Sequence, residues 1–184
     1  MRSIPSEKPF RPLQHWPMNI TLIPIKISDK SQVLTLFKEA AEKIAKKNID
    51  HWQYWKNPPK EKIEWVEEGI SNNEFFFVQD PYQRTIGMVR ILEEDLLYWG
   101  PQIDKAKYIH SLVVIEAFEG KGLGKVILQK IENDALNNGY RYLRLDSDAR
   151  NSKLCSYYVY QGFEKVGTKT LPLSSYNLYQ KNIL

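Results

Sequence analysis

Cysteine is almost absent from the sequence, since Cys155 is the only one among 184 residues. One thiol cannot form an intramolecular disulfide, which is typical of a protein from a reducing compartment. Long apolar runs are missing too. No stretch approaches the roughly 18 residues that indicate a membrane-spanning helix, and residues 1–17 contain no apolar signal core. We therefore expect a cytoplasmic protein without a membrane partner.

Metal-ligand patterns and clusters of one charge are also missing. No pair of His, Cys, Asp or Glu stands at metal-ligand spacing, which predicts no metal. The net charge of +4 comes from 26 basic and 22 acidic residues scattered along the chain. This excess mildly favours anionic partners, but without a basic cluster we expect no nucleic-acid partner. Cys155 falls within a predicted helix and has no partner base nearby in sequence, so we expect no acyl-cysteine mechanism.

Apolar periodicity predicts an alternation of strands and helices. Residues 1–17 hold four prolines and predict an irregular arm, and residues 18–184 predict one domain. Strands are expected at 19–27, with Pro24 marking an edge or a bulge, and at 74–79, 85–92, 108–115, 141–147, 163–170 and 175–180. Helices are expected at about 30–47, 60–70, 123–137 and 151–161. This order predicts an α/β (α+β) fold with a mixed sheet.

A glycine-rich loop, Glu-Gly-Lys-Gly-Leu-Gly at 119–124, stands between a predicted strand and a predicted helix. Glycines allow a positive φ and a close approach to a ligand. The helix behind the loop offers unpaired N–H groups and the positive end of its dipole, which suits a phosphate or pyrophosphate. Two nucleotide motifs do not match. A P-loop would need glycine at Glu119 and Ser or Thr at Val126, and the dinucleotide fingerprint would need glycine at Lys125 or Ile127.

Two segments resemble signatures of the GNAT superfamily of N-acetyltransferases. The loop resembles Gln/Arg-x-x-Gly-x-Gly/Ala at Gly122 and Gly124, although Glu119 stands where Arg or Gln is usual. Residues 151–163 resemble Asn-x-x-Ala-x-x-Phe-Tyr-x-x-x-Gly-Phe, with Leu154 in place of alanine. The matching positions of this second signature are Asn151, Tyr157, Tyr158, Gly162 and Phe163. The resemblance covers at least residues 73–170.

The resemblance implies a single-domain acyl-CoA N-acyltransferase fold with a mixed, mostly antiparallel twisted sheet flanked by helices. It implies transfer of the acetyl group of acetyl-CoA to a primary amine of a small molecule or peptide, by direct attack in a ternary complex. The strands at 108–115 and 141–147 would splay to admit the coenzyme. Its implied contacts are the backbone of Leu112, Val113 and Val114, the loop amides of Glu119, Gly120, Lys121, Gly122, Leu123, Gly124 and Lys125, and the side chains of Asn151 and Tyr158. The Glu119 carboxylate should point away from the phosphates, and Lys121 and Lys125 could offset its charge.

The resemblance also suggests an acid and a base. Tyr158 is the usual general acid, because a phenol with a pKa near 10 suits protonation of the departing thiolate. His110 lies nine residues before Glu119, where some branches carry Glu or His as the base. It should face the cleft if it shares a side of the strand with Leu112. Both residues have a structural alternative, namely a core aromatic and a hydrogen-bonded core histidine, and His51 is a weaker candidate base.

The acceptor pocket is expected from the first two helices and the strand that follows. Its expected lining is aromatic, which would suit a cationic or aromatic amine: His51, Trp52, Tyr54, Trp55 and Trp99. A core role is the alternative for these residues. Asp146 and Asp148 could bind the acceptor's cation or cap the next helix. A non-catalytic acyl-CoA sensor with the same fold is the alternative function, and a homodimer is left open.

Overall fold

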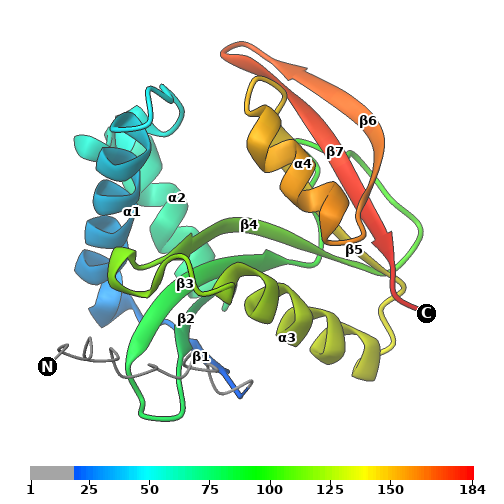
Figure 1. Ribbon diagram of the computed structural model, residues 1–184, viewed down its shortest axis with the longest axis horizontal. Coiled ribbons are helices and arrows are strands. Elements are labelled where there is room, and N and C mark those ends of the chain that lie inside the picture. The colour runs from blue at the N-terminus through cyan, green and yellow to red at the C-terminus, as the bar shows by residue number, and fades with distance from the viewer. Residues whose placement is uncertain (1–18) are drawn as a thin grey trace, which may run out of the picture.

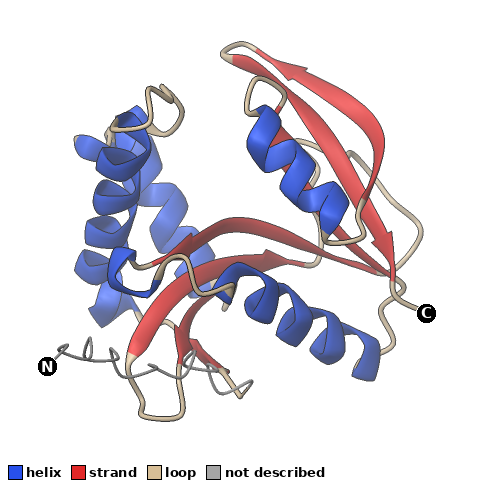
Figure 2. Ribbon diagram, viewed as in Figure 1, coloured by secondary structure: helices blue, strands red, loops and turns tan. Residues whose placement is uncertain are grey.

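The computed structural model describes residues 19–184, so the arm predicted for residues 1–17 lies outside the described residues. Seven strands and four α-helices are joined by three short 3₁₀ helices in this part of the chain (Figures 1 and 2). In chain order they are β1 (Thr21–Pro24), η1 (Ile27–Asp29), α1 (Lys30–Ala45), η2 (Gln53–Lys56), α2 (Lys60–Ser71), β2 (Phe75–Gln79), β3 (Thr85–Leu92), β4 (Ala106–Val114), η3 (Glu116–Phe118), α3 (Leu123–Asn137), β5 (Tyr142–Asp148), α4 (Ser152–Tyr160), β6 (Glu164–Leu171) and β7 (Ser174–Asn182).

The strands form one mixed sheet in the order β1-β2-β3-β4-β5-β7-β6. Only β4 and β5 pair in parallel, and every other neighbouring pair is antiparallel. The short strand β1 forms one edge and ends at Pro24, as expected for a residue that cannot donate a backbone hydrogen bond. The predicted fold class, a mostly antiparallel mixed sheet flanked by helices, is confirmed.

The sheet forks between its two parallel strands. β4 and β5 pair only from Ala106↔Tyr142 to Ile109↔Leu145, whereas β5 pairs with β7 along its whole length. Beyond Ile109 and Leu145 the two arms of the sheet diverge, and Figure 1 shows β4 leaving the β5–β7 arm there. Among residues 19–184, β4 and β5 are not paired with each other inside the fork, so their backbone N–H and C=O groups there can form hydrogen bonds with a ligand.

A β-bulge in β4 lies at the start of the fork. The register with β3 passes from Met88↔Val113 to Arg90↔His110, so β4 contains one extra residue between these pairs. Ser111, at this point, has a φ of 52°, which is rare outside glycine. The extra residue changes the alternation of side chains. His110 therefore shares its face with Val113, and the condition of a shared face with Leu112 is not met.

Helices cover both faces of the sheet. α1 and α2 pack on one face of β2–β4 around a buried cluster that includes Phe37, Val66 and Met88. α3 packs on the opposite face around Ile127 and Ile131, in a cluster that also contains the inner side chains of β5 and takes in residues of α4. No helix within residues 19–184 has the length and apolar character needed to cross a membrane.

Candidate active site

The first side chains inside the fork are His110 on β4 and Asp146 on β5. They follow the last parallel pair, Ile109↔Leu145, and lie on the face that α1 and α2 cover. His110 Nδ1 is 3.4 Å from Asp146 Oδ1. Their side chains are only 16% and 10% exposed. The fork thus brings together two predicted site residues that are 36 positions apart in the sequence.

A third member of this cluster, Asp95, comes from the loop between β3 and β4. Its Oδ2 is 2.8 Å from His110 Nε2, and its side chain is 6% exposed. A turn fixes the carboxylate, because Asp95 Oδ1 accepts a hydrogen bond from the N–H of Tyr98 and its carbonyl accepts one from Trp99. Asp95 is not predicted from the sequence, since nothing in the local pattern of the loop indicates that it reaches His110.

The electrostatics of the cluster couple its three groups. Burial lowers the pKa of His110, but the hydrogen bond to Asp95 and the negative charge of Asp146 outweigh it, so the net shift is upward. Burial raises the pKa of Asp146 to about 6, against the opposing effect of His110. Asp146 Oδ1 has no hydrogen-bond partner among residues 19–184. Because the two side chains are in contact, their titrations are coupled and belong to the pair.

Tyrosines surround the cluster on the same face. The Tyr98 ring lies 5.5 Å from the His110 ring and 5.2 Å, edge on, from Tyr176. Burial and the nearby charge of Asp146 raise the pKa of Tyr98, so its phenol stays protonated. Burial, with Tyr176 nearby, also raises the pKa of Tyr54 to about 12. The site therefore combines carboxylates with aromatic rings, a combination that attracts cations.

The tryptophans expected to line the acceptor pocket pack against other aromatic rings. Trp55 is 3% exposed and stacks on Phe37 with ring centroids 4.0 Å apart, so it belongs to the core. Trp52 packs edge on against the same Phe37 ring, at 5.7 Å, and beside His51. Trp99 lies 5.9 Å from the Tyr108 ring. Trp55 thus has the core role that was its alternative, and a tyrosine ring, that of Tyr98, lies next to His110.

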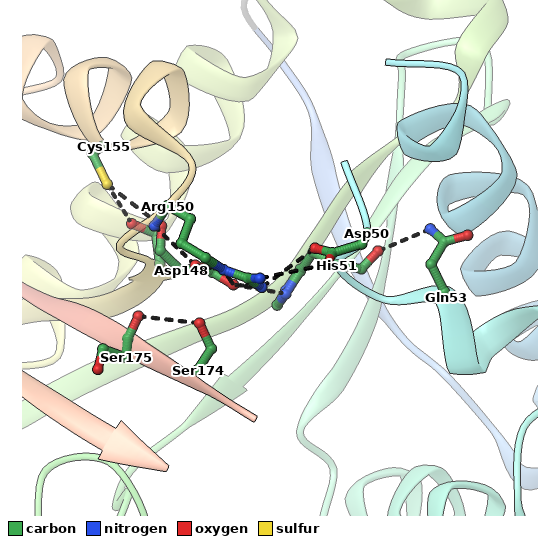
Figure 3. Close-up of polar contacts among 9 residues, drawn as sticks. Asp50, His51, Gln53, Asp148, Arg150, Cys155, Ser174 and Ser175 are labelled. Atoms are coloured by element: carbon green, nitrogen blue, oxygen red, sulfur yellow. Dashed lines mark hydrogen bonds and ion pairs between the residues drawn. The ribbon is translucent and has the colours of Figure 1, made fainter. Parts of the chain in front are cut away.

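The segment between α1 and α2 contacts the end of β5 across the fork (Figure 3). Asp148 Oδ2 lies 2.8 Å from Arg150 Nη2 and 3.6 Å from His51 Nδ1, and Arg150 Nη2 lies 3.3 Å from Asp50 Oδ1. Hydrogen bonds from Arg150 lower the pKa of Asp148 to about 2, despite burial. Burial lowers the pKa of His51. Asp148 is thus paired with Arg150, whereas the N-cap of the next helix, the structural role predicted for Asp148, is Asn151.

The glycine loop has the geometry of an anion cradle. Gly120 and Gly122 have φ of 70° and 73°, and Gly122 is the N-cap of α3. Lys125 and Val126 both donate their N–H to the Gly122 carbonyl. The N–H groups of the first residues of α3 point out of the N-terminal end of the helix, where an anion can bind. The N–H of Glu119 instead donates to the Glu116 carbonyl at 3.1 Å.

The second signature packs directly against the first. Asn151 is the N-cap of α4 and accepts a hydrogen bond from the N–H of Leu154 at 3.1 Å. A Cβ at Gly124 would lie 2.7 Å from Tyr157 Oη, so a larger residue in this first turn of α3 would displace the ring. Tyr158 packs 5.9 Å from Tyr179, and burial together with Asp146 raises its pKa. The loop and α4 therefore form one wall of the fork.

Comparisons with known sequences agree with this geometry. A family model described as the acetyltransferase (GNAT) family matches residues 39–163, which is more than half of the chain. A curated protein, the uncharacterized N-acetyltransferase YesJ of Bacillus subtilis (strain 168), is 34% identical over 92 residues, or 50% of this chain and 49% of the relative. The matched segment thus spans about half the length of that relative.

Solved structures share the fold at lower identity. A GNAT-family acetyltransferase from Listeria monocytogenes 4b F2365 has a TM-score of 0.73 and 23% identity over 89% of this chain and 94% of that one. The microcin C7 self-immunity acetyltransferase MccE, in complex with acetyl-CoA and AMP, has a TM-score of 0.64 and 17% identity, over 90% and 94% of the two chains. A chimera of spermidine N-acetyltransferase from Vibrio cholerae and hSSAT has a TM-score of 0.63 and 16% identity, over 89% and 95%.

The forked mixed sheet and its structural neighbours define the acyl-CoA N-acyltransferase fold. With the family model across both signatures, the chain belongs to the acetyltransferase (GNAT) family.

Proposed function

We propose that this protein transfers the acetyl group of acetyl-CoA to a primary amine by direct attack in a ternary complex. The observation that carries the proposal is the fork, which has His110, Asp95 and Asp146 on one face and the glycine loop with Tyr158 on the other. An amine could approach from the α1–α2 face while the acetyl donor enters between the arms. The two substrates would then bind in separate pockets and meet at the fork, as direct transfer from one to the other requires.

The acetyl donor would occupy the wall formed by β4, the loop and α4. The first amides of α3 and the backbone of Leu112–Val114, beyond the last β4–β5 pair, are the groups available to it. A diphosphate suits the amides, because they combine free donors with the positive end of the helix dipole. Gly124 has no Cβ, so the backbone of the first turn of α3 stays open to a ligand. A Cβ at this position would also lie 2.7 Å from Tyr157 Oη.

The proton would leave the amine through His110. Asp95 accepts the Nε2–H of the neutral imidazole, which leaves Nδ1 as the proton acceptor on the side of Asp146. The amine nitrogen then attacks the thioester carbon, the C–S bond breaks, and Tyr158 gives its proton to the departing sulfur. Asp146, whose Oδ1 lacks a hydrogen-bond partner among the described residues, would hold the incoming ammonium before it loses that proton.

The acceptor class that the site favours is a cationic amine of a small molecule or peptide. Two buried carboxylates and the rings of Tyr98 and Tyr176 lie around His110. Because the spermidine N-acetyltransferase chimera shares the fold, polyamines are a natural first group to test beside peptides and aromatic amines.

Release of free thiol from acetyl-CoA with a panel of amines tests the proposal. We expect turnover with at least one cationic amine, and loss of turnover in His110→Ala without loss of acetyl-CoA binding. The alternative, a sensor of acyl-CoA, binds the coenzyme equally in both proteins and releases no thiol with any amine. No binding of acetyl-CoA by the wild type would contradict both functions.

A further inference from the structure

Lys43 of α1 lies outside both family signatures and yet reaches the glycine loop. We propose that Lys43 binds the diphosphate of acetyl-CoA and supplies the positive side chain that the loop lacks at Glu119, with Glu119 as the residue that positions it. This inference rests on the proposed function. It adds a coenzyme contact from a helix that no loop motif includes.

The contacts of Lys43 place its ammonium at the start of the loop. Lys43 Nζ forms an ion pair with Glu119 Oε1 and lies 3.4 Å from the Val114 carbonyl, at the end of β4. An ammonium has three N–H donors, so two go to these acceptors and one is left for a ligand. The Lys43 side chain is 16% exposed, which limits it to a small range of positions.

A pocket lies beside these contacts. It has a volume of about 240 Å³ and is lined by α1 and by the end of β4, and its charged residues are Glu39, Glu42, Lys43, Lys46 and Glu116. Figure 1 shows η3 and the loop in front of α1. A ligand bound to the backbone of Val114 would lie next to the Lys43 ammonium, which is 3.4 Å from the Val114 carbonyl.

The two lysines of the loop have neighbours of their own. Lys121 Nζ lies 5.7 Å from the Phe118 ring centroid. Lys125 lines a second pocket, of about 400 Å³, together with Lys181 and residues of α4. Lys43 pairs with Glu119 and offsets its charge, and the offset expected from Lys121 and Lys125 stays a prediction. Without a partner, the Glu119 carboxylate would repel a diphosphate. When the carboxylate holds Lys43 at the start of the loop, the ammonium of Lys43 attracts the diphosphate.

A binding experiment separates a direct contact from simple neutralisation of Glu119. Calorimetric titration with acetyl-CoA and with S-acetyl-pantetheine, which has no phosphate, would compare the wild type with Lys43→Met, Glu119→Gln and the double variant. We expect Lys43→Met to weaken acetyl-CoA binding by about tenfold or more, since a hydrogen bond to a charged group is lost. S-acetyl-pantetheine binding should stay the same.

Measurements in the Glu119→Gln variant distinguish a direct contact of Lys43 with the diphosphate from neutralisation of Glu119. A direct contact predicts that Lys43→Met still weakens acetyl-CoA binding when residue 119 is neutral. If the lysine replacement has no effect there, Lys43 only neutralises Glu119 and the proposal is overturned. Lys38→Met, on the same helix but outside this pocket and outside the ion pair with Glu119, is the matched control and should bind as the wild type does. Lys43→Arg, which keeps the charge, should retain binding, and a loss equal to that of Lys43→Met would also overturn the proposal.

Failure of this proposal differs from failure of the proposed function. A wild type that binds acetyl-CoA, with Lys43→Met binding it equally well, overturns only the role of Lys43. A wild type that binds neither acetyl-CoA nor S-acetyl-pantetheine overturns both.

Discussion

The two walls of the fork are built differently. On the proposed coenzyme side, most groups available to a ligand are backbone: the glycine loop, the first turn of α3 and the end of β4, which are close together in sequence. The proposed acceptor side is made of side chains from separate elements, with Asp95 from a loop, His110 from β4, Asp146 from β5 and Tyr176 from β7. Replacing a side chain should therefore affect chemistry on the acceptor side, whereas the coenzyme side should respond mainly to changes of shape and charge.

The largest expected effect is on the acceptor side. His110→Ala should lower kcat by about 100-fold to 10,000-fold, because it removes the proton acceptor. The Kd for acetyl-CoA should stay within about twofold, since the loop amides and Lys43 are untouched. Steady-state kinetics with the best amine of the panel and a coenzyme titration measure the two quantities. A large fall in kcat together with an equally large rise in the Kd for acetyl-CoA would show that the two walls do not act independently.

Tyr158→Phe tests the one side chain of the coenzyme wall that is expected to do chemistry. We expect kcat to fall by about tenfold to a thousandfold because the thiolate then leaves without a proton donor. Tyr157→Phe is the matched control, since Tyr157 packs against Gly124 and has no assigned proton transfer. An unchanged kcat in Tyr158→Phe would remove Tyr158 from the mechanism.

Asp95→Asn should change the pH dependence more than the maximal rate. In the wild type, kcat/KM should rise with pH through the raised pKa of His110, because only the neutral imidazole accepts a proton. Removing the Asp95 carboxylate removes a cause of that upward shift, so the rise should move to lower pH. The maximal rate should fall by about tenfold as the imidazole loses its orientation. A pH–rate profile measures both, and a rise that stays at the same pH would contradict the pairing.

The same contrast explains what the sequence could predict. The glycine loop, its helix and the Asn151–Phe163 signature are local patterns, and the structure brings them together as packed neighbours. His110 and Asp146 were predicted singly, but their contact depends on where the β4–β5 pairing ends. The face of His110 depends on the bulge at Ser111, which strand periodicity does not reveal.

Long-range partners explain the remaining misses. Asp95 contacts His110 only because β3 and β4 are paired, so the loop sequence gives no signal for it. Lys43 is a charged residue on an amphipathic helix, where a solvent-facing lysine is the ordinary expectation. Trp55 shows the opposite error, since an aromatic residue beside prolines was expected to line a pocket and instead stacks on Phe37. Each miss concerns a side chain whose partner lies in another element.

The smallest expected effect concerns the contact that joins the two signatures. A glycine within a helix usually costs about 0.5–1 kcal/mol relative to alanine, so Gly124→Ala would ordinarily stabilise the protein. Here the new Cβ would lie 2.7 Å from Tyr157 Oη, and that ring must move. We therefore expect Gly124→Ala to lower Tm by about 2–4 °C, which corresponds to about 1 kcal/mol in a chain of this size, and to weaken acetyl-CoA binding a few-fold.

The double variant Gly124→Ala/Tyr157→Phe removes the hydroxyl that the new methyl group would meet, so Tm and coenzyme affinity should both return towards the wild-type values. Thermal melts and coenzyme titrations of the two single variants and the double variant measure this coupling. Additive effects of the two substitutions would mean that α3 and α4 do not meet through this contact. The coenzyme wall would then depend on the loop backbone without a contribution from the contact of Gly124 with Tyr157. The contrast between a backbone wall and a side-chain wall would be sharper in that case.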